Sequence, residues 1–471
     1  MRKNRSTRIA VAHRVRRAAA VSLALCALLS AVDVTTAPRR AAARHSGAPN
    51  VLIILTDDQR AGNTLKVMPE TRARFAKNGT RFTQAFATTP LCCPSRASIM
   101  TGRYAHNHGV KTNADAGDLD HSSTLQRYMD QSGYRTAIFG KFLNGWDLTR
   151  DPPYFDDWAI GGPSRYYGGS WNVQGSLETV EQYSTDFVAG QAVAFLEDAE
   201  RDDSRPWLMY VAPGAPHMPA VAEADYIGAP IPRWHKNRAV LEKHRGDKPP
   251  YVQARDAILW KVRRTRARQL RSLLSADDLV TDVFDKLGRL DENASTLAFF
   301  LSDNGFMWGE HGLSGSAHNK RSPYTQSSKI PFMMRWPGHV SRHERDGRLV
   351  ATIDIVPTVL DATGVAPNLV APLDGDSLLQ GGERSQLLLE HWTDDDAIPE
   401  WASLRSKSYQ YVEYYGEADL GPDFREYYDL KKDRWQLRNL LGDARDSNDP
   451  ETGQLAAVLD DLRHCRGNAC P

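Results

Sequence analysis

Four hydrophobic runs along the chain each end in charged or amide side chains. Within each run, apolar residues follow one another without the alternation of apolar and polar positions that a half-buried strand shows. Continuous runs of this length are typical of strands covered on both faces, as in a parallel sheet between two layers of helices. With the polar residues that follow them, the runs occupy residues 50–59, 134–144, 206–217 and 295–305.

Helical patterns lie between these runs. Residues 184–200, STDFVAGQAVAFLEDAE, place apolar side chains three to four positions apart, which predicts an amphipathic helix with Ser184 as its N-cap. Strands that alternate with helices predict an α/β fold with a doubly wound, mixed or parallel sheet between helix layers. In such sheets, ligands bind at the carboxyl ends of the strands.

The polar residues at the four strand ends are therefore candidates for one shared site. Two of the ends carry carboxylate and amide oxygens, the ligands that Ca²⁺ and Mg²⁺ prefer, and no cluster of His and Cys with zinc-like spacing accompanies them in the sequence. A single Asp-Asp pair is commonly a turn or a helix cap, but four converging strand ends favour a functional site. The candidates are Asp57, Asp58, Lys141, His217, Asp303 and Asn304.

The pattern of polar and apolar residues changes after about residue 370. Residues 403–417 and 424–430 alternate polar and aromatic side chains, which predicts a small antiparallel sheet. A helix is expected near the C-terminus. We therefore predict a C-terminal α+β subdomain over residues 371–471, packed on the main domain.

The N-terminal segment carries most of the positive charge. Residues 1–45 hold ten Arg or Lys and one Asp, so the rest of the chain has a net charge of −8 although the whole sequence has +1. Basic residues precede an apolar run at 18–32, which indicates a signal peptide and linker over 1–45; an uncleaved membrane anchor is the alternative. We expect an exported protein without stable membrane insertion. The mildly acidic body argues against nucleic-acid binding.

Apart from Cys26 in the apolar run, the cysteines form two pairs. Cys465 and Cys470 are close enough in the sequence to form a disulfide in an oxidising compartment. Cys92 and Cys93 are adjacent, and adjacent cysteines bridge only through a strained ring. The adjacent pair, in TPLCCPSRASIMTGR, therefore needs another explanation.

The residues after this pair are typical of a helix start. Pro94 suits a first helical turn, and Gly102 suits a C-terminal stop. Cys92 is then expected at the N-terminus of a helix, where backbone N–H groups favour an anion. Arg96 lies one turn further on the same face, so its guanidinium can contact the same anion.

Together these motifs resemble the type I sulfatases, whose signature is C-x-P-S-R-A-S-x-x-T-G-R. The chain contains CCPSRASIMTGR, and NVLIILTDDQ, GKFLN, APHMP, SDNG and IPFMMRWPG occur around it in the order of that family. The resemblance runs from residue 49 to about 365, and REYYDL and QLRNL extend it to about 440. It implies an alkaline-phosphatase-like fold with a catalytic domain over residues 46–370.

The resemblance also implies a modified nucleophile and a metal ion. Cys92 would be oxidised to Cα-formylglycine by a formylglycine-generating enzyme acting on the CCPSR motif, with Cys93 at the variable position. The hydrated aldehyde would attack the sulfur of a sulfated carbohydrate while held on Ca²⁺, or on Mg²⁺. The implied metal ligands are Asp57, Asp58, residue 92, Asp303 and Asn304.

Roles for the remaining site residues follow from the same resemblance. Arg96 and Lys141 would neutralise the sulfate charge and orient formylglycine. His217 and Lys320 would bind sulfate and protonate the departing alcohol, and Asp303 would accept the proton of the attacking hydroxyl. The implied catalytic set is Cys92, Arg96, Lys141, His217 and Lys320.

The segment GKFLN departs from the G-K-W-H of many sulfatases. Leu143 stands where those enzymes carry a histidine that serves as the base for sulfate release, and Asn144 cannot serve as a base. With PLCCPSRASI and residues 273–290, this segment resembles the N-acetylglucosamine-6-sulfatase branch. We therefore expect an exported sulfatase that removes the 6-O-sulfate of N-acetylglucosamine in glycosaminoglycan-like glycans. The alternatives are a phosphonate monoester or phosphodiester hydrolase of the same superfamily and a non-catalytic glycan-binding relative.

A few further segments carry weaker signals. His106, His108 and His311 could serve metal or acid chemistry, although surface or supporting roles are commoner for histidine. The basic residues 260–271 could contact a sulfated polysaccharide or form a solvated helix face. Residues 165–172, RYYGGSWN, could line a sugar site or form a plain hairpin.

Overall fold

The computed structural model describes most of the chain after residue 46. The apolar run that predicts a signal peptide lies outside the described residues. These are residues 47–162, 165–202, 204–315, 318–393, 397–416 and 421–470.

A mixed sheet of ten strands forms the centre of the fold, in the order β10-β2-β9-β8-β1-β7-β3-β4-β5-β6. Strands β8, β1, β7, β3 and β4 run parallel, whereas β9 and the hairpin β5–β6 run antiparallel to their neighbours. The strands are β1 (Asn50–Thr56), β2 (Thr80–Phe86), β3 (Arg135–Gly140), β4 (Asp157–Gly161), β5 (Gly169–Val173), β6 (Ser176–Val180), β7 (Trp207–Ala212), β8 (Thr296–Ser302), β9 (Phe332–Arg335) and β10 (Glu344–Ala351).

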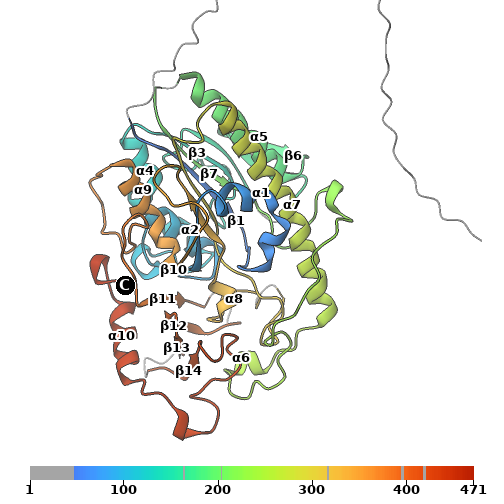
Figure 1. The fold of residues 1–471 in the computed structure, drawn as a ribbon, viewed down its shortest axis with the longest axis vertical. Helices are drawn as coiled ribbons and strands as arrows, with labels where there is room; N and C mark the ends of the chain where they lie inside the picture. Colours follow the sequence, from blue (N-terminus) through green and yellow to red (C-terminus); the bar gives the residue numbers. More distant parts are fainter. Residues whose placement is uncertain are drawn as a thin grey trace, which may run out of the picture. The chain divides into compact units, whose positions relative to one another are not determined.

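Alternate residues of β1 face two different helix layers. Val51, Ile53 and Leu55 pack with α2, α4 and α9, whereas Leu52 and Ile54 pack with α5 and α7. The hydrophobic run is thus buried on both faces, as its continuity predicts. Figure 1 shows α5 and α7 together along one side of the sheet. The helices are α1 (Pro69–Thr71), α2 (Cys92–Thr101), α3 (Ala105–His108), α4 (Leu125–Gln131), α5 (Ser184–Ala199), α6 (Pro250–Gln253), α7 (Leu259–Arg289), α8 (Thr325–Ser328), α9 (Ile355–Thr363) and α10 (Gly453–Arg463).

The predicted helix after residue 183 is α5, but the prediction of Ser184 as its N-cap is wrong by one residue. Tyr183 is the N-cap, with φ −57° and ψ 127°, and Ser184 is already helical. Tyr183 is anchored because its ring is buried and its hydroxyl donates to the Val221 carbonyl at 2.8 Å. Residues 165–172 lead into the β5–β6 hairpin, and the basic residues 260–271 lie in α7.

A second, antiparallel sheet lies near the C-terminus, as predicted. It shares a buried hydrophobic cluster with Phe86, Tyr104 and Ile353 of the main fold. The predicted disulfide between Cys465 and Cys470 is present. The first strand was not predicted, and the domain boundary at residue 370 stays a prediction. The sheet contains β11 (Gln386–His391), β12 (Glu400–Ser406), β13 (Tyr409–Tyr415) and β14 (Phe424–Asp429) in this order.

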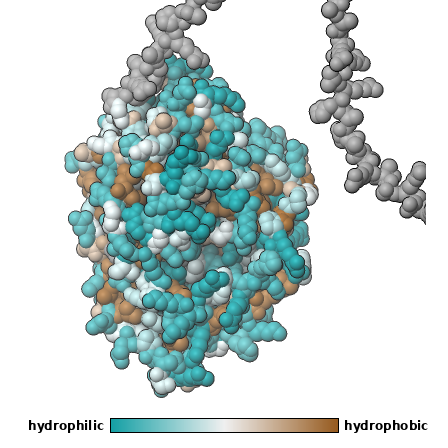
Figure 2. Space-filling model, in the orientation of Figure 1, coloured by the Kyte–Doolittle hydropathy of each residue, from teal (hydrophilic) through white to brown (hydrophobic). Residues whose placement is uncertain are grey.

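The face drawn in Figure 2 is mostly hydrophilic, with hydrophobic residues scattered among polar ones. Within the described part of the chain, no helix combines the length and the apolar character that a membrane span requires.

Candidate active site

The carboxyl ends of β1 and β8 lie side by side. The two strands are parallel, with Thr56 opposite Ser302, so the residues that follow them meet at one edge of the sheet. The backbone N–H of Asp58 donates to Asp303 Oδ1 at 3.0 Å, and the N–H of Asp303 donates to the Thr56 carbonyl at 3.1 Å. The structure therefore brings together the two pairs of oxygen ligands that the sequence places at separate strand ends.

Cys92 is the first residue of α2, and its side chain points at this edge. Its Sγ lies 3.5 Å from Asp57 Oδ1 and 3.8 Å from Asp58 Oδ1. The helix ends as predicted, with Gly102 in the left-handed region at φ 68°. Burial raises the pKa of the Cys92 thiol, although two nearby lysines oppose this shift. An unmodified Cys92 would therefore stay protonated and would be a weak nucleophile.

Lys141 and Arg96 pair with the carboxylates from one side. Lys141 follows β3, and its Nζ donates to Asp57 Oδ2 at 2.8 Å. Arg96 lies one turn into α2, and its Nε donates to Asp303 Oδ2 at 2.9 Å. Burial alone would lower the pKa of Lys141, but Asp57 raises it above its ordinary value. Both cations therefore stay charged although their side chains are almost fully buried.

Lys320 reaches the cluster from the segment between β8 and α8. Its Nζ lies 2.6 Å from Asp58 Oδ1 and 2.7 Å from Cys92 Sγ. Burial opposes the charge, but Asp58 and its neighbours raise the pKa of Lys320 well above its ordinary value. Any oxygen that replaced the sulfur at position 92 would thus lie within reach of a permanent cation.

The arrangement fits a hard divalent cation. Ligand atoms of Asp57, Asp58, Cys92 and Asp303 all lie within 4.8 Å of one another. The Oδ1 atom of Asn304 is buried and has no hydrogen-bond partner among the described residues, while its Nδ2 donates to Asp58 Oδ1. Oxygen ligands suit Ca²⁺ or Mg²⁺. Three carboxylates already face three cations, so a divalent ion would leave excess positive charge for an anionic substrate.

Burial also changes the proton affinity of Asp303. With the further influence of Asp57, burial raises the pKa of Asp303 to about 6, although Arg96 opposes the shift. Ser95 supports the same residue, because its hydroxyl donates to the Asp303 carbonyl.

His217 lies at the more open side of the cluster. Its side chain is 20% exposed, and its Nε2 lies 3.8 Å from Asp58 Oδ2. A ligand nitrogen of His217 also lies within 4.8 Å of ligand atoms of Asp57 and Cys92. Burial lowers the pKa of His217 even though the carboxylates oppose this. The hydroxyl of Tyr166 donates to the His217 carbonyl at 2.7 Å, which holds the backbone at His217 in place.

Leu143 and Asn144 supply no base to the cluster. Leu143 is buried and belongs to the same hydrophobic core cluster as Phe142 and Cys93. Cys93 is likewise a core residue, and its backbone N–H donates to Asn113 Oδ1 at 3.0 Å. At the position where many sulfatases carry a histidine, this chain therefore has an apolar side chain that packs in the core.

His108 and His311 have structural surroundings. His108 Nδ1 accepts from the N–H of Val110, and its Nε2 lies 3.0 Å from the Ser98 hydroxyl. His311 stacks on Tyr324, and its Nδ1 lies 2.7 Å from Glu242 Oε2. Burial lowers the pKa of both histidines to about 3. Neither belongs to the group of residues that gathers around Cys92.

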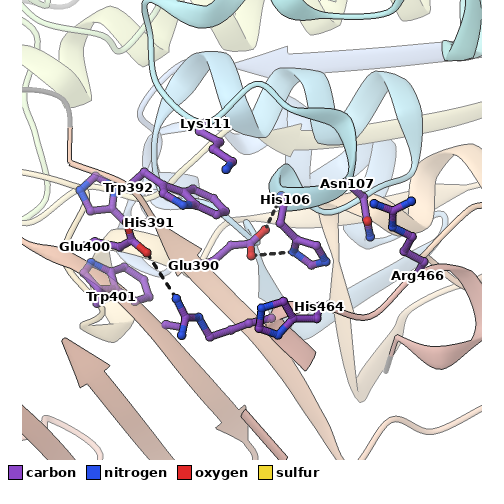
Figure 3. A pocket seen from close by; sticks show the side chains of 12 residues that line it. His106, Asn107, Lys111, Glu390, His391, Trp392, Glu400, Trp401, His464 and Arg466 are labelled. Atoms are coloured by element: carbon purple, nitrogen blue, oxygen red, sulfur yellow. Dashed lines mark hydrogen bonds and ion pairs between the residues drawn. The ribbon is translucent and has the colours of Figure 1, made fainter. Parts of the chain in front are cut away.

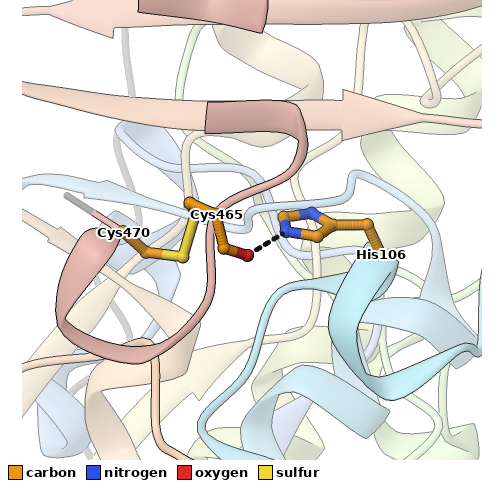
Figure 4. Close-up of side chains that lie close together, drawn as sticks. All are labelled: His106, Cys465 and Cys470. Atoms are coloured by element: carbon orange, nitrogen blue, oxygen red, sulfur yellow. Dashed lines mark hydrogen bonds between the residues drawn. A yellow bond between two sulfur atoms is a disulfide. The ribbon is translucent and has the colours of Figure 1, made fainter. Parts of the chain in front are cut away.

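His106 belongs to a different pocket, beside the C-terminal sheet. Figure 3 shows its ring facing Glu390, whose Oε2 lies 2.8 Å from His106 Nδ1. Figure 4 shows the other ring nitrogen facing the backbone carbonyl of Cys465, at 3.0 Å, next to the disulfide. Both partners only accept hydrogen bonds, so both contacts form only when His106 is protonated. His106 links the main fold to the C-terminal segment.

Sequence reasoning missed the polar residues that hold the strand ends together. Ser302 is one, since the backbone N–H of Gln59 donates to its hydroxyl at 2.8 Å. Gln59 in turn accepts from the Thr56 hydroxyl at 2.8 Å. The density of polar residues in TDDQ and SDNG is the only sequence signal for this network.

The chain matches a known family over most of its length. The family described as Sulfatase matches residues 49–365, which include all the residues of this cluster. A second description, N-sulphoglucosamine sulphohydrolase, C-terminal, matches residues 309–464.

The names of similar proteins support the assignment to this family. N-acetylglucosamine-6-sulfatase of Capra hircus is 30% identical over 503 residues, covering 91% of this chain and 86% of the relative. The Homo sapiens protein of that name is 30% identical and covers 90% and 86%. The putative extracellular sulfatase Sulf-1 homolog of Caenorhabditis elegans is 32% identical over 70% of this chain. The chain spans only 48% of that protein and 33% of its Drosophila melanogaster counterpart.

Solved structures share the fold at lower identity. One, described as a complex with its substrate D-glucosamine-2-N,6-O-disulfate, has a TM-score of 0.76 and 21% identity, and covers 88% of this chain and 97% of its own. The phosphonate monoester hydrolase of Agrobacterium radiobacter has a TM-score of 0.67 and 22% identity, and covers 84% and 92%. The predicted alkaline-phosphatase-like fold is confirmed, and the chain belongs to the Sulfatase family.

Proposed function

We propose that this chain is an exported, Ca²⁺-dependent sulfatase that removes the 6-O-sulfate of N-acetylglucosamine from glycosaminoglycan-like glycans. The observation that carries the proposal is the buried cluster in which Cys92 meets three carboxylates and three cations. The names of the relatives at about 30% identity and the GKFLN segment support the choice of sugar. The phosphonate hydrolases match only at the level of fold, so they support the alternative less strongly.

The residues that would hold the ion are Asp57, Asp58, Asp303, Asn304 and the side chain at position 92. A bound Ca²⁺ or Mg²⁺ would polarise a sulfate oxygen, and formylglycine made from Cys92 would supply the nucleophile. The chain itself supplies the oxygen ligands, the exclusion of water and the charge balance around them.

The cations of the cluster would bind and orient the sulfate. Lys320 Nζ lies beside position 92, and Lys141 and Arg96 hold Asp57 and Asp303 in place. Because their pKa values are raised, all three keep their charge in the buried site. His217, at the more exposed side, would bind the sulfate with Lys320 and protonate the departing sugar oxygen.

The modification of Cys92 would require a formylglycine-generating enzyme as a partner. In the folded chain Cys92 is completely buried at the start of α2. The CCPSR segment would therefore have to meet that enzyme before this part of the chain folds.

Two measurements test the proposal. Purified exported protein should release sulfate from N-acetylglucosamine-6-sulfate and p-nitrophenyl sulfate much faster than it cleaves phenyl phosphonate esters. The peptide of residues 89–103 should have the mass of a residue in which a carbonyl oxygen replaces the thiol and one hydrogen of Cys92. Faster cleavage of phosphonate esters would favour the hydrolase alternative. An unmodified thiol with no turnover would favour a non-catalytic glycan-binding protein.

A further inference from the structure

A groove of about 900 Å³ lies outside the cluster described above. It is formed by β2, the segment before α7, the segment between α8 and β9, and the C-terminal sheet, and it lies near α8 in Figure 1. Among the described residues that line it, nine are Arg or Lys and none is Asp or Glu. The chain after residue 45 has a net charge of −8, so this concentration of positive charge runs against the rest of the molecule.

Two cations of this groove, one buried and one half-buried, have no carboxylate partner among the described residues. Arg405 is only 5% exposed, and its hydrogen bonds go to the neutral side chains of Thr325 and Gln410, both at 2.8 Å. Its Nε is buried and has no hydrogen-bond partner in the described chain. Lys329 Nζ donates to the neutral Gln84 at 3.0 Å. Buried charges are normally paired, so this arrangement leaves room for an anion.

The two cations are close enough to influence each other. Both lie near the Phe86 ring, Lys329 at 5.7 Å and Arg405 at 4.9 Å from its centroid. Burial, and then the charges of Arg405 and Arg81, lower the pKa of Lys329 to about 8. Their mutual repulsion would be relieved by an anion bound between them.

Two arginines also lie side by side on neighbouring strands at the rim of the groove. Arg81 of β2 and Arg345 of β10 are direct neighbours in the strand register. Burial, and then the nearby charge of Arg345, lower the pKa of Arg81. No carboxylate pairs with either arginine among the residues that the structure describes, and Lys236 and Arg238, both exposed, lie on another wall. The rim is thus suited to several anionic groups along an extended ligand.

Aromatic side chains and the position of the groove suit a sugar chain. Trp234, Trp308 and Trp435 line it, and tryptophan offers a large apolar face with one polar N–H. Arg60, which also lines the groove, follows Asp58 by two residues, so one end of the groove is close to the metal-ligand edge of the sheet.

We propose that this groove binds a chain of a sulfated polysaccharide, with Arg405 and Lys329 holding one sulfate and the rim arginines and lysines holding others. The choice of a sulfated glycan rests on the proposed function, but the binding itself does not require turnover. A nucleic acid is the less suitable polyanion, because the acidic remainder of the surface would repel so large a ligand.

The experiment compares two triple variants of the full chain. The groove variant is Lys236→Ser/Arg238→Ser/Arg345→Ser. The control, Lys77→Ser/Arg201→Ser/Arg289→Ser, removes the same charge from exposed positions that do not line the groove. Binding of a heparin octasaccharide is measured by calorimetry at 0.15 M salt. Turnover of p-nitrophenyl sulfate is measured in parallel.

We expect the groove variant to bind the octasaccharide about tenfold more weakly, since three exposed charge contacts are lost. The control should bind normally, and both should turn over p-nitrophenyl sulfate within about twofold of the parent. Equal losses in the two variants, or no loss in the groove variant, would overturn the proposal. So would equally tight binding of a single-stranded DNA of the same net charge. Absence of turnover with normal octasaccharide binding would contradict only the proposed function.

A second variant tests the deep part of the groove. Lys329→Gln removes a half-buried charge that lacks a carboxylate partner, so it should raise the melting temperature while weakening octasaccharide binding several-fold. A lower melting temperature with unchanged binding would show that Lys329 serves the fold, and would remove it from the proposed site.

Discussion

Two regions of the molecule bury positive charge in opposite ways. In the cluster around Cys92, each cation has a carboxylate within 3 Å: Lys141 has Asp57, and Lys320 has Asp58. In the groove, Arg405 and Lys329 are surrounded by neutral partners. Paired charges fix the geometry of a site before its ligand arrives, whereas unpaired ones leave a strong preference for an anionic ligand. The cluster around Cys92 is therefore suited to catalysis, whereas the groove is suited to binding an anion.

The largest effect is expected where the paired cluster loses a carboxylate. Asp303→Asn removes one of the proposed metal ligands and leaves Arg96 without its partner at 2.9 Å. We expect sulfate-ester hydrolysis to fall by about a thousandfold. The matched control is Asp256→Asn, whose side chain is 93% exposed, and it should keep full activity. Less than a tenfold loss in Asp303→Asn would place the chemistry elsewhere.

Removal of a paired cation should cost both activity and stability. In Lys320→Met, Asp58 loses a partner at 2.6 Å, so we expect about three hundredfold lower activity and about 3 kcal/mol lower stability to urea in the presence of a chelator. The exposed Lys66→Met is the control. Lys329→Gln in the groove should change stability in the opposite direction. If both lysine variants shifted stability equally, the contrast between paired and unpaired cations would fail.

His217 should matter most for substrates with poor leaving groups. In His217→Gln we expect about a hundredfold loss of kcat on N-acetylglucosamine-6-sulfate, because the departing sugar oxygen needs a proton. p-Nitrophenol leaves without one, so the loss on p-nitrophenyl sulfate should be below about tenfold. Equal losses on the two substrates would assign His217 to sulfate binding alone.

The smallest effect concerns a cation whose charge depends on pH. Burial lowers the pKa of His106, but Glu390 more than compensates and raises it above the ordinary value. The contacts of the protonated ring with Glu390 and the Cys465 carbonyl therefore stabilise the fold fully below pH 6.5, and this contribution is lost as pH rises through the folded pKa.

The test of this contact compares His106→Gln with the parent by urea unfolding. The variant should be less stable by about 1 kcal/mol at pH 5.5 and nearly equal at pH 9. In Glu390→Gln the pH dependence should largely disappear. A difference that grows with pH would contradict the protonated state of His106.

The cluster around Cys92 could be predicted from the sequence because its residues stand in short, dense motifs at strand ends. Asp57 and Asp58 are adjacent in the sequence, as are Asp303 and Asn304. The parallel pairing of β1 and β8 then brings the two pairs together at one edge of the sheet. The basic groove could not be predicted in this way, because its Arg and Lys residues come one or two at a time from seven separate stretches of the chain. The pairing of His106 with Glu390 could not be predicted either, because the two residues are 284 positions apart in the sequence. Strand β11 was missed although it is as long as β3 and β7, which were predicted.

The most direct test is a crystal structure of the purified protein, with anomalous scattering to identify the ion. We predict one Ca²⁺ at about 2.3–2.6 Å from oxygens of Asp57, Asp58, Asp303 and Asn304. An oxygen-bearing side chain at position 92 should complete its ligands. An unmodified Cys92 thiol, or an ion bound away from these four residues, would contradict the account.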